Sequence, residues 1–360
     1  MFIESLDLKD YRNYEELHVG FSKGTNLLYG DNAQGKTNVL EALYLCAAAR
    51  SHRGSKDREI IRFGCKESHI RMKLQRRNMP YVIDIHLKKD HPKGIAVNGI
   101  PLKKASELFG ILDVVCFSPE DLYIIKNGPS ARRRFVDSEL CLLSPLYVKE
   151  LVDYNRTLVQ KNHLLREYAG KSGWEGMLDI YDEQLKSCGD KLIIERRDFL
   201  NELDEIIRRI HREITSGTEE LKLKYESCDF RDLRKEELRQ HMTLSGPHRD
   251  DIGFYINGKD LRTYGSQGQQ RTAALSLKLA EIELVGKKAG EPPVLLLDDV
   301  LSELDTRRQN KLVGAIGNIQ TIITAAGIEE YLSGDFHTSR MMHVVDGTIN
   351  IPEVKDGTGI

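Results

Sequence analysis

The sequence predicts an α/β fold, a mixed sheet with flanking helices, into which a helical arm is inserted. Three observations predict it. A glycine-rich loop at 30–37, G-x-x-x-x-G-K-T, joins a short apolar run to a helical pattern. A second apolar run at 294–297 ends in two carboxylates. Between these segments, residues 129–216 contain few glycines and have the pattern of long helices.

The composition is typical of a globular chain. The 360 residues have a mass of 41.0 kDa, and 40% are hydrophobic and 30% charged, which suits two domains or one large domain with an insertion. No apolar run is long enough to cross a bilayer, and acids stand where a signal peptide has an apolar core, so we expect a cytoplasmic protein. Six widely spaced cysteines without a C-x-x-C pair favour inert thiols over zinc or redox chemistry.

Alternating apolar and polar residues at 2–8 and 17–21 predict two strands that lead into the glycine-rich loop. This loop has the strand, loop and helix context of a phosphate-binding P-loop; the alternative is a chance match. Its glycines let backbone N–H groups face phosphates, Lys36 reaches the β- and γ-phosphates, and the Thr37 hydroxyl ligates Mg²⁺. The residues expected to bind the nucleotide are Gly30, Asp31, Asn32, Ala33, Gln34, Gly35, Lys36, Thr37 and Asn38.

Two polar segments stand on either side of the P-loop in sequence. Residues 9–14 form a turn that places Arg12 and Asn13 near the phosphates, or else a plain hairpin loop. Residues 50–54, Arg50-Ser51-His52-Arg53-Gly54, either approach the phosphate or adenine or solvate a helix end.

Further strands are predicted at 70–75, 81–87, 94–97 and 114–117. The four residues Ser118, Pro119, Glu120 and Asp121 then have the pattern of a helix start, with a serine cap, a proline in the first position and acids in the first turn. Capping explains all four, so a catalytic role for Glu120 or Asp121 is the weaker alternative.

The helical stretch is interpreted as an arm over 129–216, between an N-terminal part, 1–128, and a C-terminal part, 217–360, of one nucleotide-binding head. Apolar residues between Phe199 and Ile214 recur at spacings of three and four, and those from Leu151 to Leu165 suggest a partner helix. The net charge is −2, but the chain contains clusters of basic residues. These clusters form either a local basic face that binds DNA or a face that is only solvated. Its candidates are Arg76, Arg77, Arg132, Arg133 and Arg134.

Strands at 221–225 and 252–256 follow the arm. Between them, His248, Asp250 and Asp251 imitate a metal cluster. No second acidic cluster completes such a site, so charged turn residues are the favoured interpretation.

The apolar strand at 294–297 ends in Asp298 and Asp299. Asp298 at this edge suits a Mg²⁺ ligand, and Asp299 points to the other side, where it polarises the attacking water. In the turn that follows, Asp305 is placed to reach across a dimer interface.

A segment opening a helix at 266–269, Ser266-Gln267-Gly268-Gln269, predicts an anion site at the helix N-terminus. It resembles the S-G-G-Q signature of ABC-type ATPases, in which two heads sandwich two nucleotides and each P-loop faces the signature of the other subunit. The resemblance implies an ABC-type P-loop ATPase head in which Ser266, Gly268, Gln269 and Asp305 contact the partner's nucleotide.

More than two hundred residues separate the P-loop from the signature. This spacing is similar to that of DNA-repair and chromosome-maintenance ATPases and differs from that of transporter subunits. Within that group the chain resembles the RecF family of recombination mediators over nearly its whole length. The segments that carry the resemblance are 6–14, 30–38, 117–122, 132–137, 245–251, 266–269 and 296–305.

The RecF resemblance implies an ATP-dependent homodimer that binds DNA at gaps or at junctions of single and double strand. It also implies work with RecR and RecO proteins to load RecA, and a weak DNA-stimulated ATPase that uses Mg²⁺, Lys36, Asp298 and Asp299. Two departures from the general ABC pattern suggest slow hydrolysis: Asp299 stands in place of glutamate, and Thr324 in place of the switch histidine.

Three rival functions stay open. The first is an ABC ATPase subunit of a transporter, in which the helical arm would have no evident role. A nuclease regulated by its P-loop needs an acidic two-metal site, for which the chain after Ala326 leaves no room. A structural protein with a vestigial P-loop is disfavoured because every ATPase segment is intact.

Overall fold

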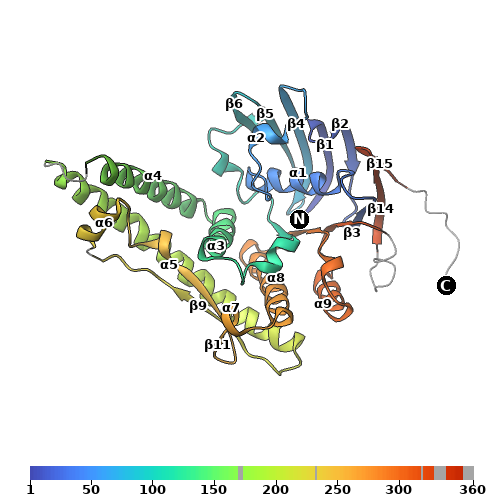
Figure 1. Ribbon diagram of the computed structural model, residues 1–360. Helices are drawn as coiled ribbons and strands as arrows, with labels where there is room; N and C mark the ends of the chain where they lie inside the picture. The colour runs from blue at the N-terminus through green and yellow to red at the C-terminus, as the bar shows by residue number, and fades with distance from the viewer. Residues whose placement is uncertain (169–172, 232, 318, 328–337, 352–360) are drawn as a thin grey trace. The chain divides into compact units, whose positions relative to one another are not determined.

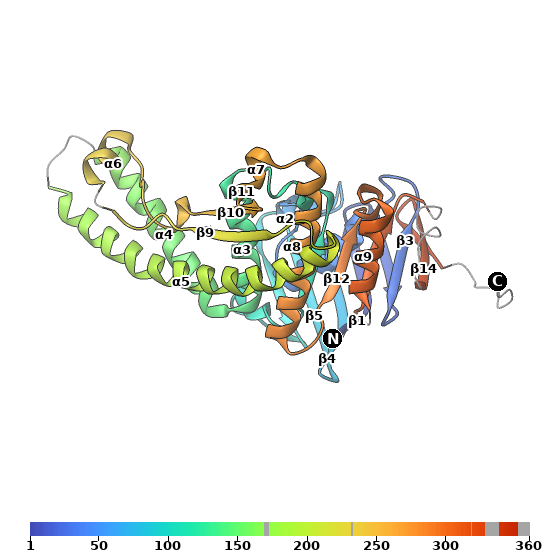
Figure 2. The same ribbon diagram turned by 90° about the horizontal axis from the view of Figure 1, so that it is seen from below.

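The computed structural model describes residues 1–168, 173–231, 233–317, 319–327 and 338–351 (Figures 1 and 2). The chain divides into two compact units, which we call unit 1 (Met1–Asp121 and Glu281–Ile360) and unit 2 (Leu122–Ala280). This division differs from the expected head and arm, because it places 217–280 with the arm. The reason is that β9 (Leu221–Glu226) packs along α5 (Glu175–Ile214) and pairs with β10 (Asp251–Ile256).

Unit 1 contains an antiparallel sheet of order β2-β1-β4-β5-β6-β7. Buried and exposed residues alternate along β4, so one face packs on the core and the other faces solvent. The expected strands at 2–8, 17–21, 70–75, 81–87 and 94–97 are confirmed within this sheet. Its strands are β1 (Phe2–Tyr11), β2 (Tyr14–Gly20), β4 (Glu67–Arg76), β5 (Met79–Lys88), β6 (His91–Val97) and β7 (Ile100–Pro101).

A second sheet in unit 1 has the order β15-β14-β3-β13-β12-β8. All neighbouring pairs are parallel except β14 with β15, so the carboxyl ends of β3, β12 and β13 meet at one edge. The strands are β3 (Thr25–Tyr29), β8 (Val114–Phe117), β12 (Val294–Asp298), β13 (Thr321–Ala325), β14 (Thr338–Val345) and β15 (Thr348–Asn350).

Helix α1 (Lys36–Ala48) packs on strands of both sheets of unit 1. Nearly all its residues are buried, which explains why it lacks the polar face of a surface helix. The helix therefore holds the P-loop rigidly to both layers. Other helices among the described residues of unit 1 are α2 (Asp57–Ile60), η1 (Ala105–Leu108), η4 (Leu301–Glu303) and α9 (Thr306–Ile316).

The helix start expected at 118–121 is one 3₁₀ turn, η2 (Pro119–Tyr123). The Ser118 backbone N–H and hydroxyl both donate to the Asp121 carboxylate, at 2.8 and 3.1 Å. Asp121 therefore caps this turn, whereas the Ser118 hydroxyl, expected to be the cap, donates a hydrogen bond to Asp121.

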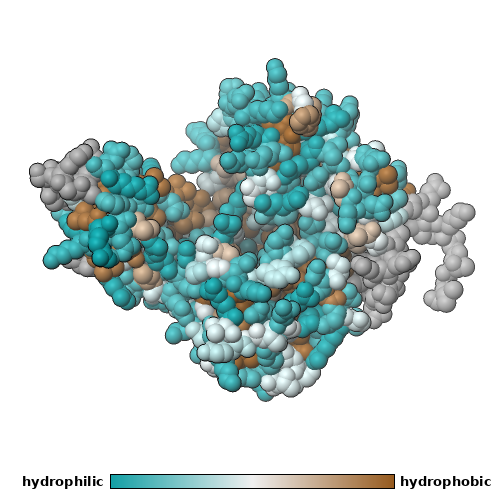
Figure 3. Space-filling view, viewed as in Figure 1, coloured by the Kyte–Doolittle hydropathy of each residue, from teal (hydrophilic) through white to brown (hydrophobic). Residues whose placement is uncertain are grey.

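Unit 2 is built on the helical arm. Helices α4 (Pro145–Tyr168) and α5 run side by side as the expected amphipathic pair, and α3 (Pro129–Leu143) packs on both (Figures 1 and 2). The arm carries exposed apolar side chains, among them Leu146, Val159 and Ile180, and Figure 3 shows apolar patches in a largely hydrophilic surface. The other elements are α6 (Arg234–Gln240), η3 (Pro247–Arg249), β11 (Lys259–Asp260), α7 (Leu261–Tyr264) and most of α8 (Gln267–Ala289).

Candidate functional site

The P-loop joins β3 to α1, and its glycines are required by both conformation and space. Gly30 and Gly35 have φ values of 147° and 117°, which side-chain-bearing residues rarely adopt. A Cβ on Gly30 would lie 2.3 Å from the Val344 carbonyl oxygen, and one on Gly35 would lie 2.7 Å from the Tyr14 hydroxyl. The predicted strand, loop and helix context is confirmed.

Lys36 is the first residue of α1 and is buried. Its ammonium group donates to the carbonyl oxygens of Gly30 and Asp31, at 2.5 and 2.7 Å. Burial lowers the pKa of Lys36, and the carboxylate of Asp299 is the strongest influence in the opposite direction. The cation is thus held over the loop, where a phosphate can replace the two carbonyl contacts.

The carboxylate of Asp298 lies against the P-loop because β12 and β3 end at the same edge of the sheet. Its Oδ1 accepts hydrogen bonds from the Thr37 and Thr324 hydroxyls, both at 2.8 Å. A hydroxyl beside a carboxylate is a donor set that suits Mg²⁺. The structure therefore brings together the two residues predicted to hold the metal.

Asp299 has left-handed backbone geometry, with φ 52°. Its N–H donates to the Thr324 hydroxyl at 2.9 Å, and its carbonyl accepts from the Ser302 hydroxyl at 2.8 Å. Thr324, which the sequence marked only as a departure from the switch histidine, thus holds both acidic residues in place.

His52 is the functional candidate that sequence reasoning did not single out. Its side chain is 10% exposed, and its Nε2 lies 4.0 Å from Asp298 Oδ2. Neither ring nitrogen has a hydrogen-bond partner among the described residues, and the ring contacts Tyr44 edge-on. Burial lowers its pKa, so the neutral form is favoured. The only signal in the sequence was a histidine within the basic loop at 50–54.

Arg12, which we expect near the phosphates, is held by partners within the protein. Its guanidinium donates to both carboxylate oxygens of Glu41 on α1, at 2.7 and 2.8 Å, and to Ser55 and the Glu59 carbonyl. Burial raises the pKa of Glu41, but hydrogen bonds from Arg12 and Ser51 outweigh it, so the pKa is lowered overall. Arg12 therefore ties the β1–β2 turn to the P-loop helix.

Asn13 contacts the P-loop from the same turn. Its Nδ2 donates to the Gln34 carbonyl at 2.9 Å, and its Oδ1 accepts from the Asn38 amide at 2.8 Å. Its observed partners are thus residues of the loop and of α1, which it braces.

The signature segment of unit 2 forms a reciprocal cap at the start of α8. The Ser266 N–H donates to Gln269 Oε1 at 2.9 Å, and the Gln269 N–H donates to Ser266 Oγ at 3.2 Å. Ser266 and Gly268 are exposed, as an anion site at a helix N-terminus requires. Asp305 caps α9 by accepting the Arg308 N–H at 3.0 Å, and its side chain is 55% exposed.

Two of the five arginines expected on a DNA-binding face are largely buried in ion pairs. Arg132 is 4% exposed and donates to both oxygens of Asp251 at 2.8 Å, and Arg76 is 14% exposed and pairs with Asp113 and Glu291. We therefore withdraw these two as DNA contacts.

The other three arginines keep different degrees of access. Arg134 is exposed, and the side chain of Arg77 is 69% exposed. Arg133 is half-buried and donates to the Asp250 carbonyl at 2.5 Å. Arg77 and Arg134 therefore offer the most accessible charge of the five.

The apparent metal cluster at 248–251 is structural, as the sequence favoured. His248 Nδ1 lies 2.6 Å from the Tyr154 hydroxyl and its Nε2 lies 3.2 Å from the Thr243 carbonyl, so Nε2 carries the proton. Asp250 is buried and pairs with Arg196 at 2.9 Å.

Comparison with known proteins identifies the group to which this architecture is similar. Residues 2–349 match the RecF/RecN/SMC N terminal domain family. The chain is 52% identical over 357 residues to the DNA replication and repair protein RecF of Lachnoclostridium phytofermentans, covering 97% of this chain and 99% of the relative.

Solved structures agree. A structure of the recombination mediator protein RecF-ATPrS in the RecFOR pathway matches with a TM-score of 0.91 and 34% identity, over 97% of this chain and 98% of that one. The corresponding RecF-ATP structure matches with a TM-score of 0.90 and 34% identity, over 98% and 97%. The fold is thus an ABC-type ATPase head of mixed α/β structure with its arm. None of the described helices is long and apolar enough to span a membrane.

Proposed function

This chain belongs to the RecF family of DNA replication and repair proteins, and we propose that it is an ATP-dependent, DNA-binding recombination mediator. The observation that carries the proposal is the meeting of Thr37, Asp298 and Thr324 beside the P-loop. Relatives named as RecF bound to ATP support the same site. Family membership disfavours the alternative function, an ATPase subunit of a transporter.

ATP binding is assigned to the P-loop, residues 30–38. Loop N–H groups receive the phosphates, and the Lys36 ammonium exchanges its two carbonyl contacts for phosphate oxygens. Thr37 and Asp298 would hold Mg²⁺, which would neutralise negative charge on the phosphates.

Hydrolysis is assigned to the acidic end of β12, with Asp299 orienting the attacking water. Its short side chain favours a slow, weak ATPase stimulated by DNA, which suits a timed clamp. The Asp298 carboxylate, fixed by two hydroxyls, is oriented before any metal binds.

Dimerisation places Ser266, Gly268, Gln269 and Asp305 of one head over the γ-phosphate bound by the other. The resulting cytoplasmic clamp closes on DNA at gaps or junctions of single and double strand, and helps RecR and RecO load RecA. Arg77, Arg133 and Arg134 are the remaining candidates for phosphate contacts on the DNA.

Binding to gapped and plain duplex DNA tests the proposal. It is measured with ATP, with ADP and without nucleotide, at one stated salt concentration because phosphate contacts are screened by salt. We expect ATP to tighten binding in the parent protein and to have no effect in Lys36→Met. The matched control is Lys23→Met, which removes a lysine outside the P-loop.

Two outcomes would contradict the proposal. The first is DNA binding that is weak and indifferent to nucleotide in the parent. The second is a Lys36→Met variant that still responds to ATP, since the response would then not arise at this P-loop.

A further inference from the structure

The solvent-facing side of the first sheet of unit 1 carries side chains that the proposed function does not use. Along β4, Glu67 and His69 project outward, while the intervening Ser68 is buried. On β5, His86 is half-buried between the buried Ile85 and Leu87. The pleat therefore places Glu67, His69 and His86 on one face.

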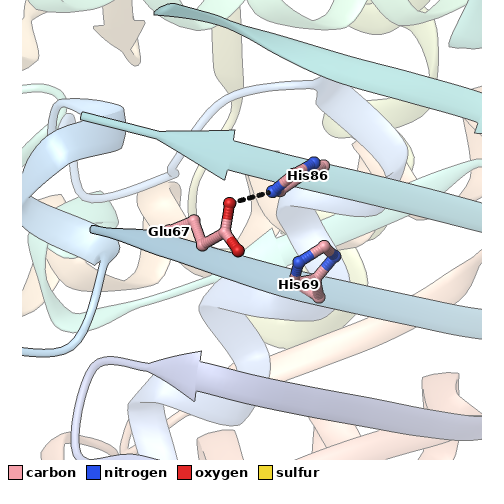
Figure 4. Close-up of side chains that lie close together, drawn as sticks. All are labelled: Glu67, His69 and His86. Carbon is pink, nitrogen blue, oxygen red and sulfur yellow. Dashed lines mark hydrogen bonds and ion pairs between the residues drawn. The ribbon is translucent and has the colours of Figure 1, made fainter. Parts of the chain in front are cut away.

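The antiparallel register brings these three residues together. His69 lies directly opposite His86, and Glu67 precedes His69 by one pleat repeat on the same strand. Figure 4 shows the three side chains gathered on the two strands, with the contact of 3.1 Å between His86 Nε2 and Glu67 Oε2. The two imidazole rings stack with their centroids 3.9 Å apart and their planes at 22°.

This group has the composition of a transition-metal site. One donor atom from each residue lies within 4.8 Å of the others, and it is the one group of three or more such side chains found among the described residues. Two imidazoles and a carboxylate are ligands that Zn²⁺ accepts, at about 2.0–2.2 Å each. Both strands are fixed within a six-stranded sheet, so rotation of the side chains would draw the three donors onto one ion.

Access to the group is open. A groove of about 730 Å³ crosses this face of the sheet, and His69 and His86 line it together with Lys9, Arg71 and Asp84. The nearest competing cation is the Lys88 ammonium, 4.0 Å from Glu67 Oε2, and its side chain is 45% exposed and able to move away. An ion and its water can therefore reach the three donors from solvent.

We propose that Glu67, His69 and His86 bind a divalent transition-metal ion of the Zn²⁺ class, with water completing the coordination. The site shares no residue with the P-loop or with the acidic end of β12. Its existence therefore does not depend on the proposed ATPase function, and either can fail without the other.

Zinc titration of the full-length protein tests this site. Metal-free protein without nucleotide or Mg²⁺ is titrated with zinc chloride by calorimetry, and the histidine ring resonances are followed by NMR. We expect one Zn²⁺ per chain and a shift of the His69 and His86 rings. His69→Gln and His86→Gln should each weaken binding by at least about tenfold, because even the loss of a residue that supports a metal ligand costs about 10–100-fold in affinity.

His18→Gln is the matched control, because His18 lies in the same sheet beside the carboxylate of Asp7 but has no second imidazole in its group. It should bind zinc like the parent. Thermal midpoints without metal check that the exposed substitutions leave the fold intact. Absence of binding by the parent overturns the proposal. So does parental affinity in either His69→Gln or His86→Gln, because the three residues would then not form one site or thiols would hold the ion.

Discussion

The hydroxyl of Thr324, near the end of β13, makes two hydrogen bonds to the acidic segment. It donates to Asp298 and accepts the N–H of Asp299, so it fixes one acidic side chain and the backbone of the other. Thr324 is buried, and no solvent can take over these bonds if the hydroxyl is removed.

Replacing this hydroxyl should impair hydrolysis. Thr324→Val keeps the shape but leaves the Asp299 N–H unpaired, at a cost of about 1–3 kcal/mol. We expect ATP turnover to fall, by about tenfold if the displacement of Asp298 and Asp299 raises the barrier by about 1.4 kcal/mol. Thr324→Ser, which keeps the hydroxyl, should stay near the parental rate. Equal turnover in the valine and serine variants would show that the hydroxyl positions nothing of importance.

His248 makes unit 2 sensitive to acid. Burial lowers its pKa to about 4, below the usual value of about 6.5 for an unfolded chain. The unfolded state therefore binds the proton first, and stability present above pH 6.5 is lost progressively as the pH falls towards 4. His248→Gln removes this titration.

We accordingly expect the free energy of unfolding to fall more steeply with acidification in the parent than in His248→Gln. The measurement is urea denaturation at a series of pH values between 7 and 4. Parallel curves for the two proteins would mean that His248 titrates at the same pH in the folded and unfolded chain.

At the scale of elements, Arg132 joins α3 to β10. Its guanidinium makes two bonds to Asp251 and also donates to the Ile125 and Asn127 carbonyls. The neighbouring Arg134, two residues along the same helix, is exposed. One run of arginines thus contains a structural residue and a surface residue.

This difference predicts that two similar substitutions will have unequal effects on stability. Arg132→Ala leaves the Asp251 carboxylate without its partner and should destabilise the protein by about 2–4 kcal/mol. Arg134→Ala should change stability by less than about 0.5 kcal/mol. DNA affinity should fall in Arg134→Ala if this residue contacts phosphate. Equal stability of the two variants by denaturant unfolding would contradict the assignment of Arg132.

At the scale of the whole molecule, the proposed sandwich needs two copies of the chain. Ser266 stands exposed at the N-terminus of α8, where a bulky cation would block a partner's phosphate. Ser266→Arg should therefore bind ATP like the parent but fail to dimerise in its presence. Nucleotide titration and light scattering measure the two properties separately. ATP-dependent dimers of Ser266→Arg would rule out the trans arrangement.

The local motifs could be predicted from the sequence because each depends on residues that are neighbours in the chain. The P-loop needs glycines at particular backbone angles, the strands need alternation, and the Ser266–Gln269 cap needs two residues three apart. The RecF resemblance likewise rested on short segments in a given order. These features follow from local geometry, so the chain alone predicted them.

Only the tertiary structure decided which charged side chains are free of partners within the protein and can contact a phosphate. Arg12 and Arg132 resemble phosphate ligands in sequence, but Glu41 and Asp251, from distant segments, bind them. The approach of His52 to Asp298 and the meeting of His69 with His86 also depend on strands or loops brought together by folding. A side chain's charge is local, whereas its partner and its exposure are set by long-range packing, which no local pattern encodes.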